Sequence, residues 1–243
     1  MALAAAWLGL SVAQVSASEV SVAVAANFVE PARAVAEAFH TATGDTALIS
    51  PGASGQLFTQ ISHGAPYEVF LSADAERPQA LVAGGYAVGQ SRFTYAVGRL
   101  ALYSASPGLV DGQGLVLKRP DLRTVAIADP AVAPYGVAAE ETMRKLGAYD
   151  ALKPKIVKGA SIAQAYQFVA TGAAEIGFVA QSQIVTVKGG SRWLVPEALH
   201  APIEQQAVLL KAGANDPAAR AFLDFLKTPA ARTIISRYGY DLR

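Results

Sequence analysis

The stretch "TALISPGASGQLFTQISHG" (residues 46–64) joins a β-rich run to an amphipathic segment that closes on a glycine. TALIS predicts a strand, and GQLFTQISHG predicts a helix with Gly64 as its natural stop. A short run of proline and small residues separates them, and Ser54 stands directly ahead of the helix. A strand that passes into a helix through a short loop is the repeating unit of parallel α/β sheets.

The same unit recurs on both sides of this stretch. Residues 20–26 predict a buried strand, after which apolar residues from Ala32 to Phe39 fall at helical spacing, with Gly44 at the exit. This alternation predicts right-handed crossovers and mostly parallel sheets. Further strands are predicted at residues 67–74, 95–103, 122–129, 155–159, 175–180 and 203–210. Further helices are predicted at 76–85, 136–152 and 161–172, and residues 216–239 predict two helical pieces separated by Pro229.

The sequence contains more strand–helix units than one small sheet would use, so it predicts two lobes. The extended segments at residues 95–103 and 203–210 lack turn signals, and we expect them to cross between the lobes. The predicted fold class is α/β, with two mixed, mostly parallel sheets flanked by helices and joined by two crossover strands. The predicted boundaries place residues 18–96 and 206–243 in lobe 1 and residues 97–205 in lobe 2.

The composition excludes several classes of function. The 243 residues are 52% hydrophobic and 16% charged, which is typical of a compact globular protein. The formal net charge is +1 and no basic run is present, so nucleic acid is not predicted as a partner. Cysteine is absent and the three histidines stand at no metal-ligand spacing, so the sequence predicts neither thiol chemistry nor a bound metal cation.

The N-terminal segment is apolar and rich in small residues. "VSA" before Ser18 suits cleavage after Ala17, so residues 1–17 are predicted to be a signal peptide and the protein to be periplasmic. No Lys or Arg precedes the apolar run, which leaves a buried N-terminal strand or helix as the alternative. No later run reaches the length of a transmembrane helix.

Ser54 allows three interpretations. A nucleophile elbow needs Gly-x-Ser-x-Gly, but Gln56 stands at the second glycine position and no histidine belongs to a motif. A Walker loop needs a lysine at the helix start, and none is near. A neutral donor at a helix N-terminus fits best, because unpaired N–H groups and the helix dipole favour an anion there. An ordinary N-cap stays open as the alternative.

Three further loops have the same design. Asn27, Tyr135 and Ile162 each follow a predicted strand and open a predicted helix. Because ligands of open parallel sheets bind outside the carboxyl ends of the strands, we expect the four loops to meet at one site. Asn27, Ser54 and Tyr135 can donate from their side chains, and Ile162 from its backbone N–H, whereas Ser161 is expected only to cap its helix. Loops with only neutral donors predict a compact, permanently ionised anion. Asn27 as a turn residue and Tyr135 as a packing residue stay open.

Five segments carry a resemblance to a known family: "VAVAANF" (22–28), "PGASGQLFTQISHGAP" (51–66), "EVFLSADAE" (68–76), "IADPAVAPYGVAAEETMRKLGAYDAL" (127–152) and "FLDFLKTPAARTIISRYGY" (222–240). Here the chain resembles the periplasmic molybdate-binding proteins of ABC transporters. The resemblance implies a bilobed periplasmic-binding-protein fold of type II that captures molybdate or tungstate in the cleft between its lobes. It implies no catalysis, no cofactor, and molybdenum only as an oxyanion. A permease and its ATPase are the implied partners. The oligomeric state stays open, and a monomer is the simplest form of a protein that shuttles to a permease.

The family's ligand-binding positions fall on residues noted above. Ser54 matches the serine of the second loop, and Asn27, with Ala26 before it, matches the donor of the first loop. Tyr135 falls at the contact of the third loop, and Ile162 at a backbone contact where the fourth helix starts.

One position departs from the family pattern. Many members have a tyrosine directly after the strand that is EIGFVA here, and its hydroxyl reaches the anion, whereas this chain has Ala180. We expect the hydroxyl of Tyr135 to replace it from the opposite side. Two alternatives stay open: a binding protein of the same fold for sulfate or another oxyanion, and a hydrolase that depends on Ser54.

Overall fold

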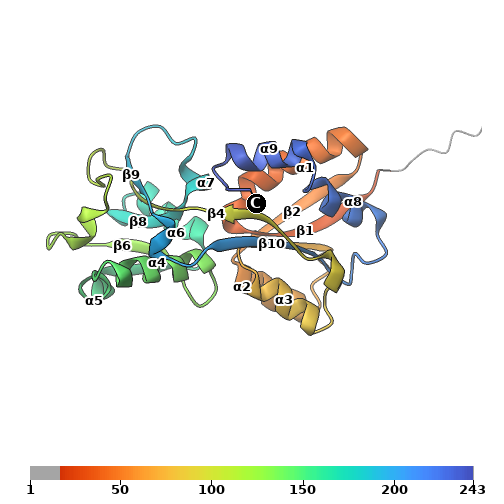
Figure 1. Ribbon diagram of the computed structural model, residues 1–243, viewed down its shortest axis with the longest axis horizontal. Helices are drawn as coiled ribbons and strands as arrows, with labels where there is room; N and C mark the ends of the chain where they lie inside the picture. Colours follow the sequence, from red (N-terminus) through yellow and green to blue (C-terminus); the bar gives the residue numbers. More distant parts are fainter. Residues whose placement is uncertain (1–16, 243) are drawn as a thin grey trace, which may run out of the picture.

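The computed structural model describes residues 17–242, which form two lobes, each built on one five-stranded sheet (Figure 1). The first sheet has the order β2-β1-β3-β10-β4 and the second the order β7-β6-β8-β5-β9. Except for Ala17, the predicted signal peptide lies outside the described residues. The strands are β1 (Glu19–Ala25), β2 (Thr46–Gly52), β3 (Val69–Ser72), β4 (Phe93–Gly98), β5 (Leu100–Ser104), β6 (Val125–Ala128), β7 (Ile156–Gly159), β8 (Ile176–Ala180), β9 (Ser191–Leu194) and β10 (Ile203–Leu209).

Helices flank both sheets. Within residues 17–242, none of them is both long and apolar enough to span a membrane. The α-helices are α1 (Val29–Thr43), α2 (Ser54–Ser62), α3 (Glu76–Ala83), α4 (Pro134–Lys145), α5 (Tyr149–Leu152), α6 (Ile162–Ala170), α7 (Gln181–Ile184), α8 (Pro217–Phe225) and α9 (Pro229–Arg237). The 3-10 helices are η1 (Ala26–Phe28), η2 (Gly89–Ser91), η3 (Leu115–Lys118), η4 (Lys153–Lys155) and η5 (Glu197–Leu199).

In the first lobe, β1 is buried between two layers of helices. It pairs in parallel with β2 and β3, while β10 runs antiparallel to β3. Alternate residues of a strand point to opposite faces. Val22 and Val24 therefore join the core with α1, α8 and α9, whereas Ala23 packs with Leu57 and Leu81 of α2 and α3. Figure 1 shows these helices on opposite sides of the sheet.

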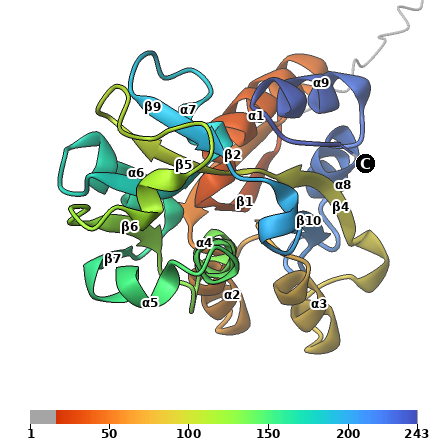
Figure 2. The same cartoon turned by 60° about the vertical axis from the view of Figure 1, so that its left-hand side comes forward.

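The second lobe follows the same plan. β6 pairs in parallel with β7 and β8, and β5 runs antiparallel to β8. Figure 2 brings this lobe forward, with α4, α5 and α6 around its sheet. The helix predicted over residues 136–152 is in fact two helices, because Gly147 follows α4 with a φ of 68° that ends the helix. The short strand β9 was not predicted.

Two connections join the lobes. The chain passes from the first sheet to the second at Arg99, between β4 and β5, and returns between β9 and β10. The segment predicted as one strand at residues 95–103 is therefore two strands of different sheets. The predicted boundaries, after residues 96 and 205, fall inside β4 and β10.

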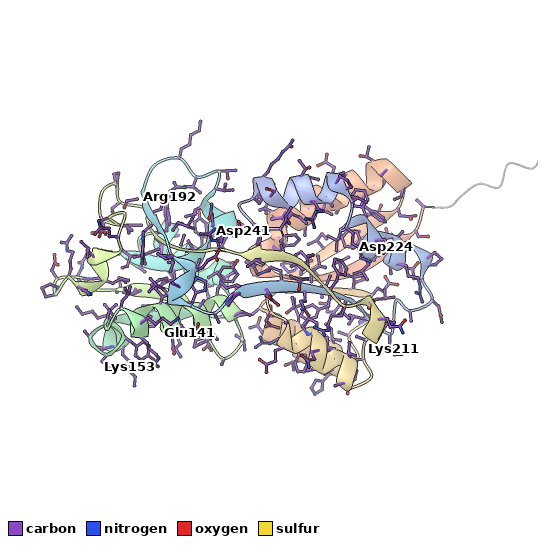
Figure 3. The ribbon with its side chains drawn as sticks, in the orientation of Figure 1. Glu141, Lys153, Arg192, Lys211, Asp224 and Asp241 are labelled. Carbon is purple, nitrogen blue, oxygen red and sulfur yellow. The ribbon has the colours of Figure 1, made fainter. Side chains whose placement is uncertain are left out.

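The end of the chain returns to the crossover. After α8 and α9, Asp241 exchanges two backbone hydrogen bonds with Val97 of β4, at 2.8 and 3.0 Å. Its side chain also forms a 3.1 Å ion pair with Arg99. Asp241 lies near the junction of the two lobes (Figure 3). The C-terminal residues therefore bind the end of β4, where the chain leaves the first lobe.

Candidate anion-binding site

A small cavity of ≈ 10 Å³ lies between the lobes, with room for about one water molecule. All five residues that the sequence predicted as ligand-binding line it. Ala26, Asn27 and Ser54 belong to the first lobe, and Tyr135 and Ile162 to the second. No lining residue is charged. The complete lining is Ala25, Ala26, Asn27, Ala53, Ser54, Ala73, Ala133, Pro134, Tyr135 and Ile162.

Helix starts from both lobes converge on this cavity. Ser54 and Ile162 are the first residues of α2 and α6, and η1 starts at Ala26. The first N–H groups of a helix have no acceptor within it, and the helix dipole adds positive charge there. Pro134 opens α4 without an N–H, so the N–H of Tyr135 is the first donor of that helix. The cavity is therefore positively polarised by neutral groups.

The Ser54 hydroxyl accepts one hydrogen bond and keeps its own proton for a further acceptor. Its Oγ accepts a 3.0 Å hydrogen bond from the backbone N–H of Ala73, and the residue is 2% exposed. The hydroxyl proton is therefore available to an acceptor in the cavity. No histidine in the described part of the chain hydrogen-bonds to Ser54, and the Nδ1 atoms of His40, His63 and His200 instead contact backbone oxygens of other residues. These contacts fit a donor and not a nucleophile.

Asn27 differs from the expectation that its side chain donates to a ligand. Its Nδ2 donates to Gln205 Oε1 and to the Tyr240 hydroxyl, each at 2.8 Å, so both side-chain N–H groups are used. Its backbone carbonyl oxygen accepts hydrogen bonds from Ser182 Oγ at 2.7 Å and from Tyr240 at 2.8 Å. The group that Asn27 can still offer is its backbone N–H.

The Tyr135 hydroxyl is buried and has no hydrogen-bond partner within the described residues. Burial, with smaller contributions from Tyr240 and Tyr95, raises the pKa of this hydroxyl well above its usual value, so it stays protonated. Gly98 makes room for it, because a Cβ at that position would overlap the hydroxyl oxygen. Ala180 is fully buried at the N-cap of α7 and supplies no polar side chain.

The lobes touch each other beside the cavity. The backbone N–H of Gly55 donates to the carbonyl oxygen of Val132, across the lobe boundary, at 2.9 Å. A Cβ on Gly55 would lie 2.9 Å from the Cα of Val132, closer than real Cβ atoms approach. At the rim, Arg77 reaches the carbonyl oxygen of Ala131 at 3.4 Å. We call this arrangement, with the two lobes in contact beside the cavity, the closed form.

A larger groove of ≈ 590 Å³ adjoins the cavity and shares Ala73 and Pro134 with it. Its lining includes four acidic residues, Asp74, Glu76, Glu141 and Glu204, and one cation, Arg77, which pairs with Asp74; Figure 3 labels Glu141. Carboxylates repel an anion, whereas the small cavity contains none. The small cavity is therefore the better candidate for an anion site.

Tyr240 makes the stability of the fold sensitive to alkaline pH. Burial raises the pKa of this tyrosine from 10.0 to about 12. Between these values the unfolded chain loses the proton while the folded protein keeps it, so the free energy of unfolding falls as pH rises. From pH 9 to pH 11 we expect Tyr240 to account for a loss of about 1.3 kcal/mol. Urea unfolding at both pH values should show that the free energy of unfolding of Tyr240→Phe falls by about 1.3 kcal/mol less than that of the wild type. An equal loss in both proteins would contradict the prediction.

Two lobes that close over a cavity of neutral donors define a bilobed solute-binding protein. A family model described as bacterial extracellular solute-binding protein matches residues 20–241. The chain belongs to this family.

Individual members are similar over nearly the whole chain. The molybdate-binding protein ModA of Rhodobacter capsulatus is 60% identical over 225 residues, which cover 93% of this chain and 89% of that protein. The molybdate-binding protein ModA of Azotobacter vinelandii is 51% identical over 238 residues, covering 97% and 94%. A solved periplasmic molybdate-binding protein of Azotobacter vinelandii has a TM-score of 0.90 at 43% identity, covering 92% of this chain and 99% of that chain.

This membership confirms several predictions. The bilobed, type II periplasmic-binding-protein fold with two mixed sheets is confirmed. Solute-binding proteins carry their ligands unchanged, so the prediction that the chain is not an enzyme is confirmed, and the hydrolase alternative at Ser54 is excluded. Proteins of this type carry no cofactor. The family is extracellular, so the chain acts outside the cytoplasm.

Proposed function

We propose that this protein is the substrate-binding component of an ABC transporter and that it captures molybdate, or tungstate, in the cavity between its lobes. The observation that supports this most is the convergence of helix starts from both lobes on a cavity without charged residues. The similar proteins described above are named as molybdate-binding proteins.

The donors at the cavity suit a tetrahedral dianion. We assign to the ligand the backbone N–H groups at Ala26, Asn27, Ser54, Tyr135 and Ile162, together with the hydroxyls of Ser54 and Tyr135. Burying an ion is costly unless its oxygens are hydrogen-bonded, and a bond to a charged acceptor is roughly twice as strong as one between neutral groups. The unpartnered Tyr135 hydroxyl gains an acceptor when an oxyanion occupies the cavity. Neutral donors are therefore sufficient without a lysine or arginine.

The same donors discriminate among anions. Hydrogen phosphate carries a proton that needs an acceptor, and a cavity of donors leaves that proton unpaired. Sulfate has the charge and shape of molybdate but is smaller, so only the size of the closed cavity separates the two. A sulfate-binding protein is therefore the second candidate.

Delivery of the ligand requires partners. The closed form docks on a membrane permease, whose ATPase drives transport. We further propose that residues 1–17 are a signal peptide that directs the protein to the periplasm. We propose that the protein is a monomer whose two lobes alternate between an open and a closed arrangement.

Thermal unfolding with four oxyanions tests the proposal. Molybdate or tungstate at about a hundred times its Kd stabilises the folded protein by roughly 2.7 kcal/mol, which raises Tm by about 5–10 °C. Sulfate and phosphate at the same concentration are expected to change Tm much less. A shift with sulfate alone would assign the protein to sulfate, and the absence of any shift would contradict oxyanion binding.

A further inference from the structure

Four buried residues form one hydrogen-bonded group behind the cavity, which we call the Asn27 cluster: Asn27, Ser182, Gln205 and Tyr240. Their exposed fractions lie between 0% and 7%. They come from four separate parts of the chain, namely η1, α7, β10 and the tail after α9. Of the four, only Asn27 lines the cavity. The other three therefore act on a ligand through the lining residues beside them, namely Asn27 and, for Tyr240, also Tyr135.

The cluster fixes Asn27 at both its side chain and its main chain. Gln205 and Tyr240 occupy its two side-chain N–H groups, and Ser182 and Tyr240 occupy its carbonyl oxygen. A residue held at both ends cannot rotate about its backbone without breaking several buried hydrogen bonds. Such breaks are costly, because each leaves a buried polar group unsatisfied.

The carbonyl oxygen of Asn27 matters for electrostatics. A carbonyl oxygen that faced a bound dianion would repel it. Ser182 and Tyr240 hold this oxygen toward themselves, and neither residue lines the cavity. Burial raises the pKa of Tyr240 to about 12, so its hydroxyl remains a donor at physiological pH. The cluster therefore keeps a repulsive group away from the site.

The same cluster spans the two lobes. Ser182 lies in α7, directly after β8 of the second sheet, whereas Tyr240 follows α9 on the first lobe. Both hydroxyls bond the same oxygen of Asn27, and they lie 3.1 Å from each other. The ring of Tyr240 is held edge-on against Phe28, with centroids 5.2 Å apart. The Ser182 contacts therefore cross from the second lobe to the first.

We propose that Tyr240 and Ser182 are positioning residues for the ligand: they orient Asn27 so that the N–H groups at the start of η1 face the anion when the lobes close. This inference rests on the proposed function. It assigns part of the affinity to two residues that do not touch the ligand.

Tyr240→Phe tests the inference, because it removes the hydroxyl and keeps the ring. Calorimetric titration with molybdate is expected to give a Kd about tenfold weaker than the wild type. Stopped-flow measurements should assign the change mainly to faster dissociation, because most changes at a binding site act on the dissociation rate. Ser182→Ala removes the hydrogen bond from the second lobe and is expected to act in the same direction.

Tyr95→Phe is the matched control. Tyr95 is also buried and packs edge-on against Phe28, with centroids 4.8 Å apart. Its hydroxyl makes only long contacts of 3.4 Å, to the Ser72 carbonyl oxygen and to Gln205 Oε1, and none to Asn27. We expect its Kd to stay within about twofold of the wild type. Urea unfolding without ligand is measured for every variant, since a purely structural role lowers unliganded stability and leaves Kd unchanged.

The outcomes separate this inference from the proposed function. If the wild type binds molybdate and both Tyr240→Phe and Ser182→Ala bind it equally well, only the inference is overturned. A Kd weakened equally in Tyr95→Phe would overturn it too. If the wild type binds no molybdate, the proposed function fails and the inference fails with it. If Tyr240→Phe does not fold, Ser182→Ala decides, because it removes a bond to the same oxygen.

Discussion

Ser54→Ala is expected to weaken molybdate binding by about 10- to 150-fold. The Ser54 hydroxyl proton is free for an acceptor in the cavity, and a hydrogen bond to a charged acceptor contributes about 1.5–3 kcal/mol. The change also removes the acceptor of the Ala73 N–H, which the serine oxygen holds at 3.0 Å. The free energy of unfolding without ligand should therefore fall by about 1–3 kcal/mol. Calorimetric titration measures the first effect, and urea unfolding the second.

Ser62→Ala is the matched control for this change. Ser62 ends the same helix, α2, and its hydroxyl donates to the carbonyl oxygen of Phe58 at 2.8 Å. It does not line the cavity. We expect this variant to bind molybdate as the wild type does. If Ser54→Ala bound as tightly as Ser62→Ala, the Ser54 hydroxyl would not be a ligand donor.

Gly55→Ala is expected to change affinity and unliganded stability in opposite directions. In the closed form the new methyl group would lie 2.9 Å from the Cα of Val132 on the other lobe. Forcing extra volume into a packed contact costs about 1–3 kcal/mol, which corresponds to a Kd about 5- to 150-fold weaker. With the lobes apart, this contact would be absent. The alanine would then stabilise the fold by about 0.4–1 kcal/mol, because it restricts the unfolded chain.

Calorimetric titration with molybdate and urea unfolding without ligand together test the Gly55→Ala prediction. Gly112→Ala is the control, because a methyl group on Gly112 would meet no atom within 4 Å and the residue does not line the cavity. It should leave Kd unchanged. A Gly55→Ala variant that bound with wild-type affinity would show that the contact between Gly55 and Val132 does not form in the ligand-bound state.

The strand-to-helix loops were predictable because their signals are local. The quoted stretch matches β2 and α2, which starts at Ser54. Ser161 caps α6 as expected, accepting a 3.3 Å hydrogen bond from the N–H of Gln164. Gly44 ends α1 with a φ of 84°. Caps, stops and strand ends are set by neighbours in the chain, so a single sequence contains them, and with them the residues that line the cavity.

The partners of Asn27 were not predictable in the same way. Gln205 and Tyr240 lie 178 and 213 positions further along the chain. No local pattern pairs an asparagine with a tyrosine near the C-terminus, so the sequence alone assigns the asparagine side chain to the ligand. The residue at which the chain passes from the first sheet to the second could not be predicted either, because β4 and β5 form one continuous extended segment around Arg99. Both features depend on how distant segments pack.

The strand order of the first sheet has a consequence for how the protein is made. β10 lies between β3 and β4, so the sheet stays in two pieces until residues 203–209 have been synthesised. The second lobe, by contrast, is one uninterrupted segment and is complete before β10 is reached. Because domains fold as the nascent chain emerges, the first lobe stays unfinished until translation is nearly over, whereas the second lobe can fold earlier.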